Sequence, residues 1–214
     1  MIEPMTTHPF LAAHDDGLPR CPWAGPGTGA AMRAYHDEEW GVPLRDDRAL
    51  FELLSLEGAQ AGLSWRTVLE RREAYRRAFR QFDIATCAAL SDGELERLRA
   101  DPGLIRNRLK ILSVRGNARA ALEVIDTAGS LAAFLWAFVD DRPVRNRWRS
   151  IAEVPASTPA SRRMSEALRR RGFRFVGPTI CYAFMQASGM VDDHLVHCFR
   201  HGTDGAVAPP RAPS

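Results

Sequence analysis

The chain has 214 residues, of which 45% are hydrophobic, and a formal net charge of +3. This length fits one domain or two small ones with a proper core, and the small positive charge permits a polyanionic partner without demonstrating one. No apolar run reaches the roughly 18 residues of a membrane span, and no basic region followed by an apolar block opens the chain. We therefore expect neither a membrane helix nor a secretory signal. Four well-separated cysteines argue against a disulfide scaffold and favour a reducing, cytoplasmic location.

Three parts are expected along the chain. Residues 1–19 show no periodicity and predict a flexible arm, and the Pro/Ala-rich residues 203–214 predict a disordered tail. Residues 20–202 show helical patterns almost everywhere, and no segment alternates convincingly over the length of a strand. We therefore predict one all-α domain without internal repeats.

The residues from Asp46 to Gly62 predict the first clear helix. Asp46 or Asp47 is its expected N-cap, and Gly58 and Gly62 mark its end. A second helix, SWRTVLERREAYRRAF, is expected to start at the N-cap Ser64 and to carry an apolar stripe. Further helices are predicted near residues 84–90, 92–100, 105–127, 130–139 and 161–171.

The stretch SRRMSEALRRRGFRFVGPTICYAFMQASG predicts two helices joined by a tight turn. The first ends in three arginines before Gly172, and cations favour that end of a helix. The connection runs from Gly172 to Gly177, and Pro178 occupies a suitable first position for the second helix. Such a turn can expose backbone N–H groups to a phosphate. On pattern alone, an ordinary antiparallel helix pair is the preferred interpretation.

The segment VDDHLVHC concentrates metal-type ligands near the end of the chain. His194 and Cys198 are four residues apart and would share one face of a helix, whereas His197 would point sideways. With Cys21 and His36 they would form a closed tetrahedral zinc site. The alternative is a free, buried Cys198 with surface histidines, and the spacing alone favours this alternative because it matches no standard zinc finger.

Aromatic residues surround one carboxylate in two further segments. Tyr35 and Trp40 flank the candidate ligand His36, and Glu57 is followed by a Gly-rich turn and Trp65. Aromatic faces and a carboxylate suit a flat, cationic or hydrogen-bonding ring. The alternative is that these residues are ordinary core and surface positions, and on the pattern alone this alternative is preferred.

Several blocks together closely resemble one family. These blocks are AYHDEEWGVP, LFELLSLEGAQAGLSW, FRQFD, RNRLKI with GNARA, RRRGFRFVGPTICYAFMQASG and VDDHLVHC. Their order and length resemble the bacterial Tag family, 3-methyladenine DNA glycosylase I, over about residues 20–200. The resemblance implies an all-α helix-hairpin-helix glycosylase fold with a structural zinc site that joins the chain ends. It also implies hydrolytic excision of 3-methyladenine from alkylated double-stranded DNA, without lyase activity.

The resemblance also implies roles for individual residues. The implied ligands of one structural Zn²⁺ per chain are Cys21, His36, His194 and Cys198. The implied base pocket comprises Tyr35, Trp40, Trp65 and Glu57, with Glu57 also the candidate catalytic residue. The implied DNA contacts, in an intruding loop and a phosphate-gripping hairpin, are Gln60, Gly62, Leu63, Gly172, Phe173, Val176 and Gly177.

Two departures and one gap qualify the resemblance. Met32 stands where the family often has a tyrosine, which is expected to soften one pocket wall, and GPGTGA lengthens the span between the first two ligands. No carboxylate follows Gly177 until Asp192, so we expect no dedicated strong base after the hairpin. Either Glu57 assists, or water attacks a largely dissociated sugar cation. Lys110 is the only candidate for a lysine nucleophile, and this role is not expected, because Lys110 follows RNR in a helix that we expect to pack or to bind backbone.

Two other functions stay open at this point. One is a zinc-stapled module that binds damaged DNA without cutting it, and the other is a glycosylase for a different modified base. No long unpatterned apolar face is present, so we expect a monomer.

Overall fold

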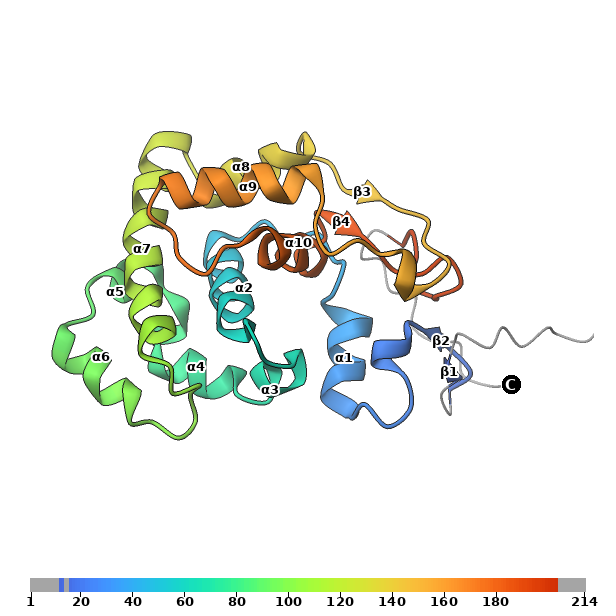
Figure 1. Cartoon of the computed structure of the whole chain (residues 1–214), viewed down its shortest axis with the longest axis horizontal. Coiled ribbons are helices and arrows are strands. Elements are labelled where there is room, and N and C mark those ends of the chain that lie inside the picture. The colour runs from blue at the N-terminus through green and yellow to red at the C-terminus, as the bar shows by residue number, and fades with distance from the viewer. Residues whose placement is uncertain (1–11, 14–15, 204–214) are drawn as a thin grey trace, which may run out of the picture.

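The computed structural model describes residues 12–13 and 16–203, and this part of the chain is mostly helical (Figure 1). The α-helices are α1 (Ala30–Glu38), α2 (Asp47–Gln60), α3 (Trp65–Leu69), α4 (Arg72–Ala78), α5 (Ile84–Ala88), α6 (Asp92–Arg99), α7 (Arg108–Ala128), α8 (Leu131–Trp136), α9 (Pro159–Arg170) and α10 (Pro178–Ala187). Short 3-10 helices are η1 (Pro22–Ala24), η2 (Arg80–Phe82), η3 (Ala137–Val139) and η4 (Ile151–Glu153). The predicted all-α fold is confirmed.

Four two-residue strands make only minimal pairings: β1 (Ala12–Ala13), β2 (Pro19–Arg20), β3 (Val144–Arg145) and β4 (Val191–Asp192). β1 pairs with β2 in antiparallel register, and β3 pairs with β4 in parallel register, with Val144 opposite Val191. The predicted arm and tail lie largely outside the described residues. Phe199 N donates to Pro19 O at 2.9 Å, so the two ends of the described chain meet at one end of the molecule (Figure 1).

The predicted caps of two helices are confirmed. The Asp46 side chain accepts from the Ala49 amide at 2.8 Å, and the Ser64 side chain accepts from the Thr67 amide at 3.3 Å. The single helix expected after Ser64 is wrong, because the chain turns between α3 and α4. This turn directs Arg72 and Arg76 of α4 onto the buried carboxylate of Glu52 in α2.

Helix α2 runs through the centre of the core. Its residues from Leu50 to Ala59 are all buried, which is expected of a helix enclosed by neighbours, here α3, α7, α8 and α10. Glu57 is therefore held inside the protein, close to the end of this central helix.

The predicted helix pair near the end of the chain is confirmed as α9 and α10. Pro178 is the first residue of α10, and Gly172 adopts φ +87° at the start of the connection. Among the described residues no single helix is long and apolar enough to cross a membrane. Helix α7 and the following Leu131–Val139 segment reach that length and composition only as a pair bent by 83°.

Candidate functional site

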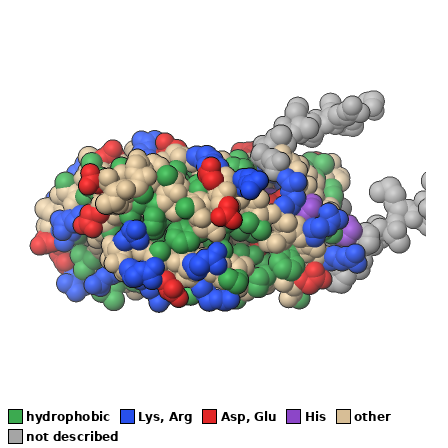
Figure 2. All heavy atoms as spheres, turned by 90° about the horizontal axis from the view of Figure 1, so that it is seen from above, with side chains coloured by type: hydrophobic (Ala, Val, Ile, Leu, Met, Phe, Trp, Pro, Cys, Tyr) green, Lys and Arg blue, Asp and Glu red, His purple; other side chains and the backbone are tan. Residues whose placement is uncertain are grey.

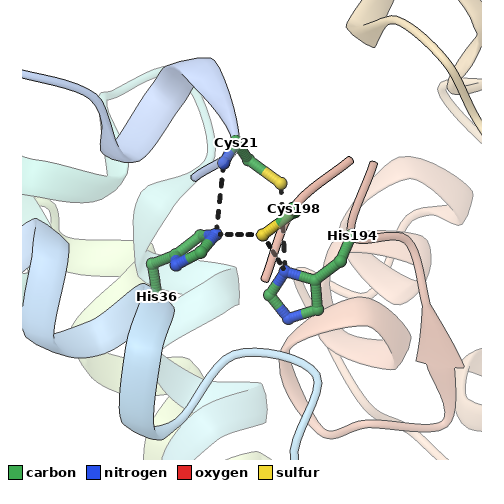
Figure 3. A group of neighbouring side chains, drawn as sticks. All are labelled: Cys21, His36, His194 and Cys198. Carbon is green, nitrogen blue, oxygen red and sulfur yellow. Dashed lines mark hydrogen bonds between the residues drawn. The ribbon is translucent and has the colours of Figure 1, made fainter. Parts of the chain in front are cut away.

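Four buried side chains from the two ends of the domain converge on one point (Figure 3). Their ligand atoms all lie within 4.8 Å of one another, and the four residues are Cys21, His36, His194 and Cys198. Two thiols and two imidazoles in this arrangement could hold a metal ion. Cys21 precedes η1, His36 lies in α1, and the other two follow β4, so the group joins the chain ends.

Both imidazoles are oriented by hydrogen bonds on their outer sides. His36 Nδ1 lies 2.8 Å from Asp37 Oδ1, and His194 Nε2 lies 3.1 Å from the Trp40 carbonyl oxygen. These acceptors require the N–H on the outer nitrogen, which leaves His36 Nε2 and His194 Nδ1 as acceptors toward the centre, where the Cys21 amide donates to His36 Nε2 at 3.4 Å. Such outer partners are typical of histidines that bind metals.

The thiols of Cys21 and Cys198 are electrostatically linked. Their mutual hydrogen bond lowers the pKa of Cys198, assisted by His194 and His36. The same bond, with burial, raises the pKa of Cys21. One thiol therefore deprotonates far more readily than the other, and a bound cation would favour the thiolate form of both.

The expectation that His194 and Cys198 lie on a helix is wrong. The segment after β4 forms successive turns, in which His194 N donates to Asp192 Oδ1 at 3.1 Å and Cys198 N donates to Leu195 O at 2.7 Å. The short polar side chain of Asp192 competes for backbone donors that a helix would need. The two ligands still face one another, with Cys198 Sγ 3.6 Å from His194 Nδ1.

A cavity of about 440 Å³ lies beside this group, between α1, the end of α2, α3, α10 and η4. Its lining includes Trp23, Met32, Tyr35, Trp40, Glu57, Gln60, Ser64, Trp65, Arg66, Ile151, Val154, Ala183, Gln186 and Asp193. An aromatic cavity with few polar groups is the usual form of a small-ligand site. All four residues of the predicted base pocket are among its walls, as is Met32.

Glu57 is the buried carboxyl group of the cavity. Only 3% of the residue is exposed, and its Oε2 atom has no hydrogen-bond partner among the described residues. Burial raises the pKa of Glu57 to about 8. Trp65 Nε1 is also buried without a partner in this part of the chain. The cavity thus offers one unused acceptor and one unused donor, which a polar ring could satisfy.

Aromatic rings connect the cavity to the metal group, by which we mean Cys21, His36, His194 and Cys198. The Trp65 ring lies 5.2 Å from the ring of Tyr35, and the Trp40 ring lies 4.5 Å from that of His194. Trp23 was not predicted from the sequence as a cavity residue. In the structure its ring lies 5.0 Å from the rings of both His36 and Trp40. Its place two residues after the ligand Cys21 was the available signal.

Asp193 and Gln186 were also missed as cavity residues. Asp193 Oδ1 accepts from the Asn146 amide and the Trp148 indole, both at 2.7 Å. Its Oδ2 accepts from the Tyr182 hydroxyl at 2.5 Å and from the Gln186 amide at 2.7 Å. This buried carboxylate joins α10 to the segment that leads into η4. No local pattern in the sequence indicates such a set of contacts.

The residues of the predicted intruding loop lie at the end of α2: Gln60 is the last residue of the helix, and Gly62 and Leu63 follow it. Gly62 adopts φ +80°, and the Leu63 side chain is 43% exposed although leucine is apolar. We call residues 60–63 the α2 end loop. The ammonium of Lys110 donates to the main-chain carbonyls of Ala59 and Ala61 at this loop.

The predicted hairpin, residues 172–177, is held firmly to the core. Phe173 and Val176 are buried, so these two residues can offer only backbone groups to a phosphate. Asn117 accepts from the Arg174 amide at 2.8 Å, and Ser165 donates to the Val176 carbonyl at 2.6 Å. Figure 2 shows basic and acidic side chains interspersed on one face of the molecule, without a single continuous basic surface.

Sequence comparison finds close relatives across the helical domain. The family model for methyladenine glycosylase matches residues 23–201. The chain is 49% identical over 181 residues to DNA-3-methyladenine glycosylase 1 of Escherichia coli, which covers 85% of this chain and 96% of that protein. It is 45% identical over 179 residues to DNA-3-methyladenine glycosylase of Haemophilus influenzae, with 84% and 96% covered.

Solved structures share the fold. A crystal structure of 3-methyladenine DNA glycosylase I is 50% identical, with a TM-score of 0.82 over 85% of this chain and 99% of that one. The Staphylococcus aureus 3-methyladenine DNA glycosylase I, solved to explain 3-methyladenine recognition, is 34% identical. Its TM-score is 0.78, over 79% of this chain and 90% of that one.

Proposed function

This chain belongs to the methyladenine glycosylase family, and on that basis we propose how its cavity excises 3-methyladenine from alkylated double-stranded DNA. The reaction is hydrolysis of the N-glycosidic bond, without a lyase step. The observation that carries the proposal is the buried, unpartnered Oε2 atom of Glu57 in an aromatic cavity.

Glu57 recognises the flipped base. A 3-methylated adenine nucleotide carries a positive charge, which the faces of Trp40, Trp65 and Tyr35 can accommodate. The same charge lowers the pKa of Glu57 on binding, so the carboxylate both accepts from ring donors and offsets the cation. An unmethylated adenine is neutral, so it does not offset the free energy needed to ionise the buried carboxyl group of Glu57.

Two loops hold the DNA: the α2 end loop and the hairpin of residues 172–177. Leu63 fills the gap left by the flipped nucleotide, as apolar wedges do in other DNA-bending proteins, with Gln60 and Gly62 shaping the loop. The main-chain N–H groups of residues 172–177 bind a phosphate of the DNA. This contact does not require a basic surface, because the N–H groups donate directly to the phosphate oxygens.

Bond cleavage needs little help from a base. As the bond between the sugar C1′ and the base N9 breaks, the electron pair neutralises the leaving purine and the positive charge moves to the sugar. Water then adds to C1′ and releases a proton to solvent. Asp193 lines the cavity, but each of its oxygens already accepts two hydrogen bonds, so we assign it no proton-accepting role.

We assign the metal site to one structural Zn²⁺. Two thiols and two outward-anchored imidazoles are the ligands that zinc prefers, whereas calcium and magnesium take oxygen ligands. The bound ion would fasten the chain ends and hold α1 beside the cavity. We further propose a cytoplasmic monomer: the four cysteines are free, and few large apolar residues are exposed among residues 16–203. Light scattering after size exclusion measures the mass.

A matched pair of variants tests the role of Glu57. Glu57→Gln removes the charge from the cavity, and we expect release of 3-methyladenine from methylated duplex DNA to fall at least a hundredfold with the fold intact. Glu52→Gln is the control, since Glu52 is a buried carboxylate on the same helix that pairs with Arg72 and Arg76. It should lose stability but keep activity in the folded fraction. Wild-type activity in Glu57→Gln would sink the assignment.

Analysis of the released bases separates the competing functions. Release of 3-methyladenine supports the proposal, release of 7-methylguanine alone supports a different modified base, and no release supports a binding module. Borohydride trapping should yield no covalent DNA adduct, and an adduct at Lys110 would overturn the monofunctional reaction.

A further inference from the structure

Lys110 grips the main chain at the end of α2. Its Nζ atom lies 2.8 Å from the Ala59 carbonyl oxygen and 2.6 Å from the Ala61 carbonyl oxygen, and the side chain is buried. Ala59 directly precedes the α2 end loop and Ala61 lies within it, and this loop presents Leu63. Within the described part of the chain, no acidic side chain forms an ion pair with Lys110, so its charge is directed at the loop.

The electrostatics of two helices favour this contact. The last carbonyls of α2 have no partner within their helix and carry partial negative charge, which a cation stabilises. Lys110 lies in the first turn of α7, where a cation is unfavourable for its own helix. Donation to α2 offsets that cost and ties the start of α7 to the α2 end loop.

The residue type at this position is also informative. Lys110 is the only lysine among 29 Lys and Arg residues. Elsewhere on α7 arginines make equivalent contacts, with Arg115 donating to Leu90 O at 2.9 Å and Arg119 donating to Ala88 O at 3.0 Å. A compact ammonium can serve two carbonyls at a buried position, whereas a planar guanidinium is larger and donates in a fixed fork.

Helix α7 also holds the hairpin. Asn117 lies seven residues after Lys110, two turns along the same face of α7. It accepts from the Arg174 amide at 2.8 Å and donates to the Arg174 carbonyl at 3.1 Å. One straight helix thus links both loops to which we assign DNA contacts (Figure 1).

We propose that Lys110 is a positioning residue, which fixes the α2 end loop to α7 and so sets the place of Leu63 relative to the hairpin. The inference rests on the proposed DNA role of this loop. Lys110 acts through Leu63 and not on the base. Its loss therefore impairs work on a duplex, where a gap must be filled, more than work on a single strand.

Three variants test the proposal: Lys110→Met, Lys110→Arg and, as matched control, Arg119→Met, which removes a cation of α7 from the end of α5. In both Lys110 variants we expect kcat/KM on methylated duplex DNA to fall at least about tenfold, or about 1.4 kcal/mol. On single-stranded DNA kcat/KM should change little, as should the affinity for free 3-methyladenine measured by tryptophan fluorescence. Arg119→Met should leave all three unchanged.

A double-mutant cycle asks whether Lys110 acts through Leu63. The double variant Lys110→Met with Leu63→Ala should lose no more duplex activity than Leu63→Ala alone, because the wedge is already absent. Fully additive losses, an equal loss on single strands, or an equal loss in Arg119→Met would overturn the proposal.

Hydrogen exchange keeps the test independent of the reaction. Amide exchange in the peptide spanning residues 59–63 should accelerate in Lys110→Met and not in Arg119→Met. Unchanged exchange in Lys110→Met would overturn the positioning role. If the wild-type protein releases no 3-methyladenine, the proposed function fails, while the exchange result still decides what Lys110 does.

Discussion

His194 donates its Nε2–H to the carbonyl oxygen of Trp40 at 3.1 Å, across 154 positions of sequence. The same imidazole faces both thiols of the metal group through Nδ1. Trp40 is a wall of the cavity. One side chain therefore couples the group that joins the chain ends to the place where we expect the base to bind.

Removal of the metal should loosen the cavity as well as the chain ends. We expect Cys198→Ser to lose bound zinc, to unfold several kcal/mol more easily and to bind free 3-methyladenine more weakly. Cys87→Ser is the control, because Cys87 is also buried but lies in α5, away from the group. Metal analysis, thermal unfolding and fluorescence titration measure the three effects. Zinc loss with unchanged base affinity would contradict the coupling.

Glu57 should make stability depend on pH. Its pKa is about 8 in the folded protein, against 4.5 ordinarily, so between these values the folded chain keeps a proton that the unfolded chain has lost. The contribution of this group to the free energy of unfolding is thus full below pH 4.5 and declines by about 1.4 kcal/mol per pH unit as pH rises toward 8. Urea unfolding should show Glu57→Gln gaining stability relative to wild type over this range. Parallel pH curves would exclude the raised pKa.

Asp193 should be a strong determinant of the cavity wall. In Asp193→Asn an amide nitrogen replaces one oxygen and faces two donors, either Asn146 and Trp148 or Tyr182 and Gln186. Losing two buried hydrogen bonds lowers the free energy of unfolding by about 3 kcal/mol. Asp92→Asn, at an exposed carboxylate on α6, is the comparison and should cost little. Equal stability of the two variants in denaturant would argue against this role.

Two glycines should respond oppositely to alanine. A Cβ at Gly189, which has φ +69°, would lie 2.4 Å from main-chain atoms of Val42 and Pro43, so Gly189→Ala should cost about 4 kcal/mol or more. Gly116 lies inside α7 with nothing within 4 Å of an added Cβ. Gly116→Ala should therefore add about 1 kcal/mol, because alanine favours helix. Thermal melts of both variants check the pair, and a loss of stability in Gly116→Ala would contradict the open space.

Features that depend on neighbouring residues can be predicted from the amino-acid sequence alone. The caps Asp46 and Ser64 and the proline that starts α10 act within one helical turn, so their residue types predict helix starts directly. The four candidate ligands could be named from their residue types, but their spacing alone favoured the alternative without a metal. The resemblance to the family implied the set, and the structure brings the four side chains together. Their assignment to zinc stays a prediction.

Contacts between segments that are distant in sequence cannot be predicted in this way. The turn after α3 comes with contacts from two arginines of α4 to Glu52 in α2, and the non-helical course of residues 194–198 comes with a contact from the His194 amide to Asp192. Two donors to Asp193, Asn146 and Trp148, lie 47 and 45 positions from it, and the two carbonyls bound by Lys110 lie 51 and 49 positions away. Hydrogen bonds and burial of this kind depend on which elements pack against one another. Hydrophobic periodicity predicts the elements and their buried faces but not their packing partners.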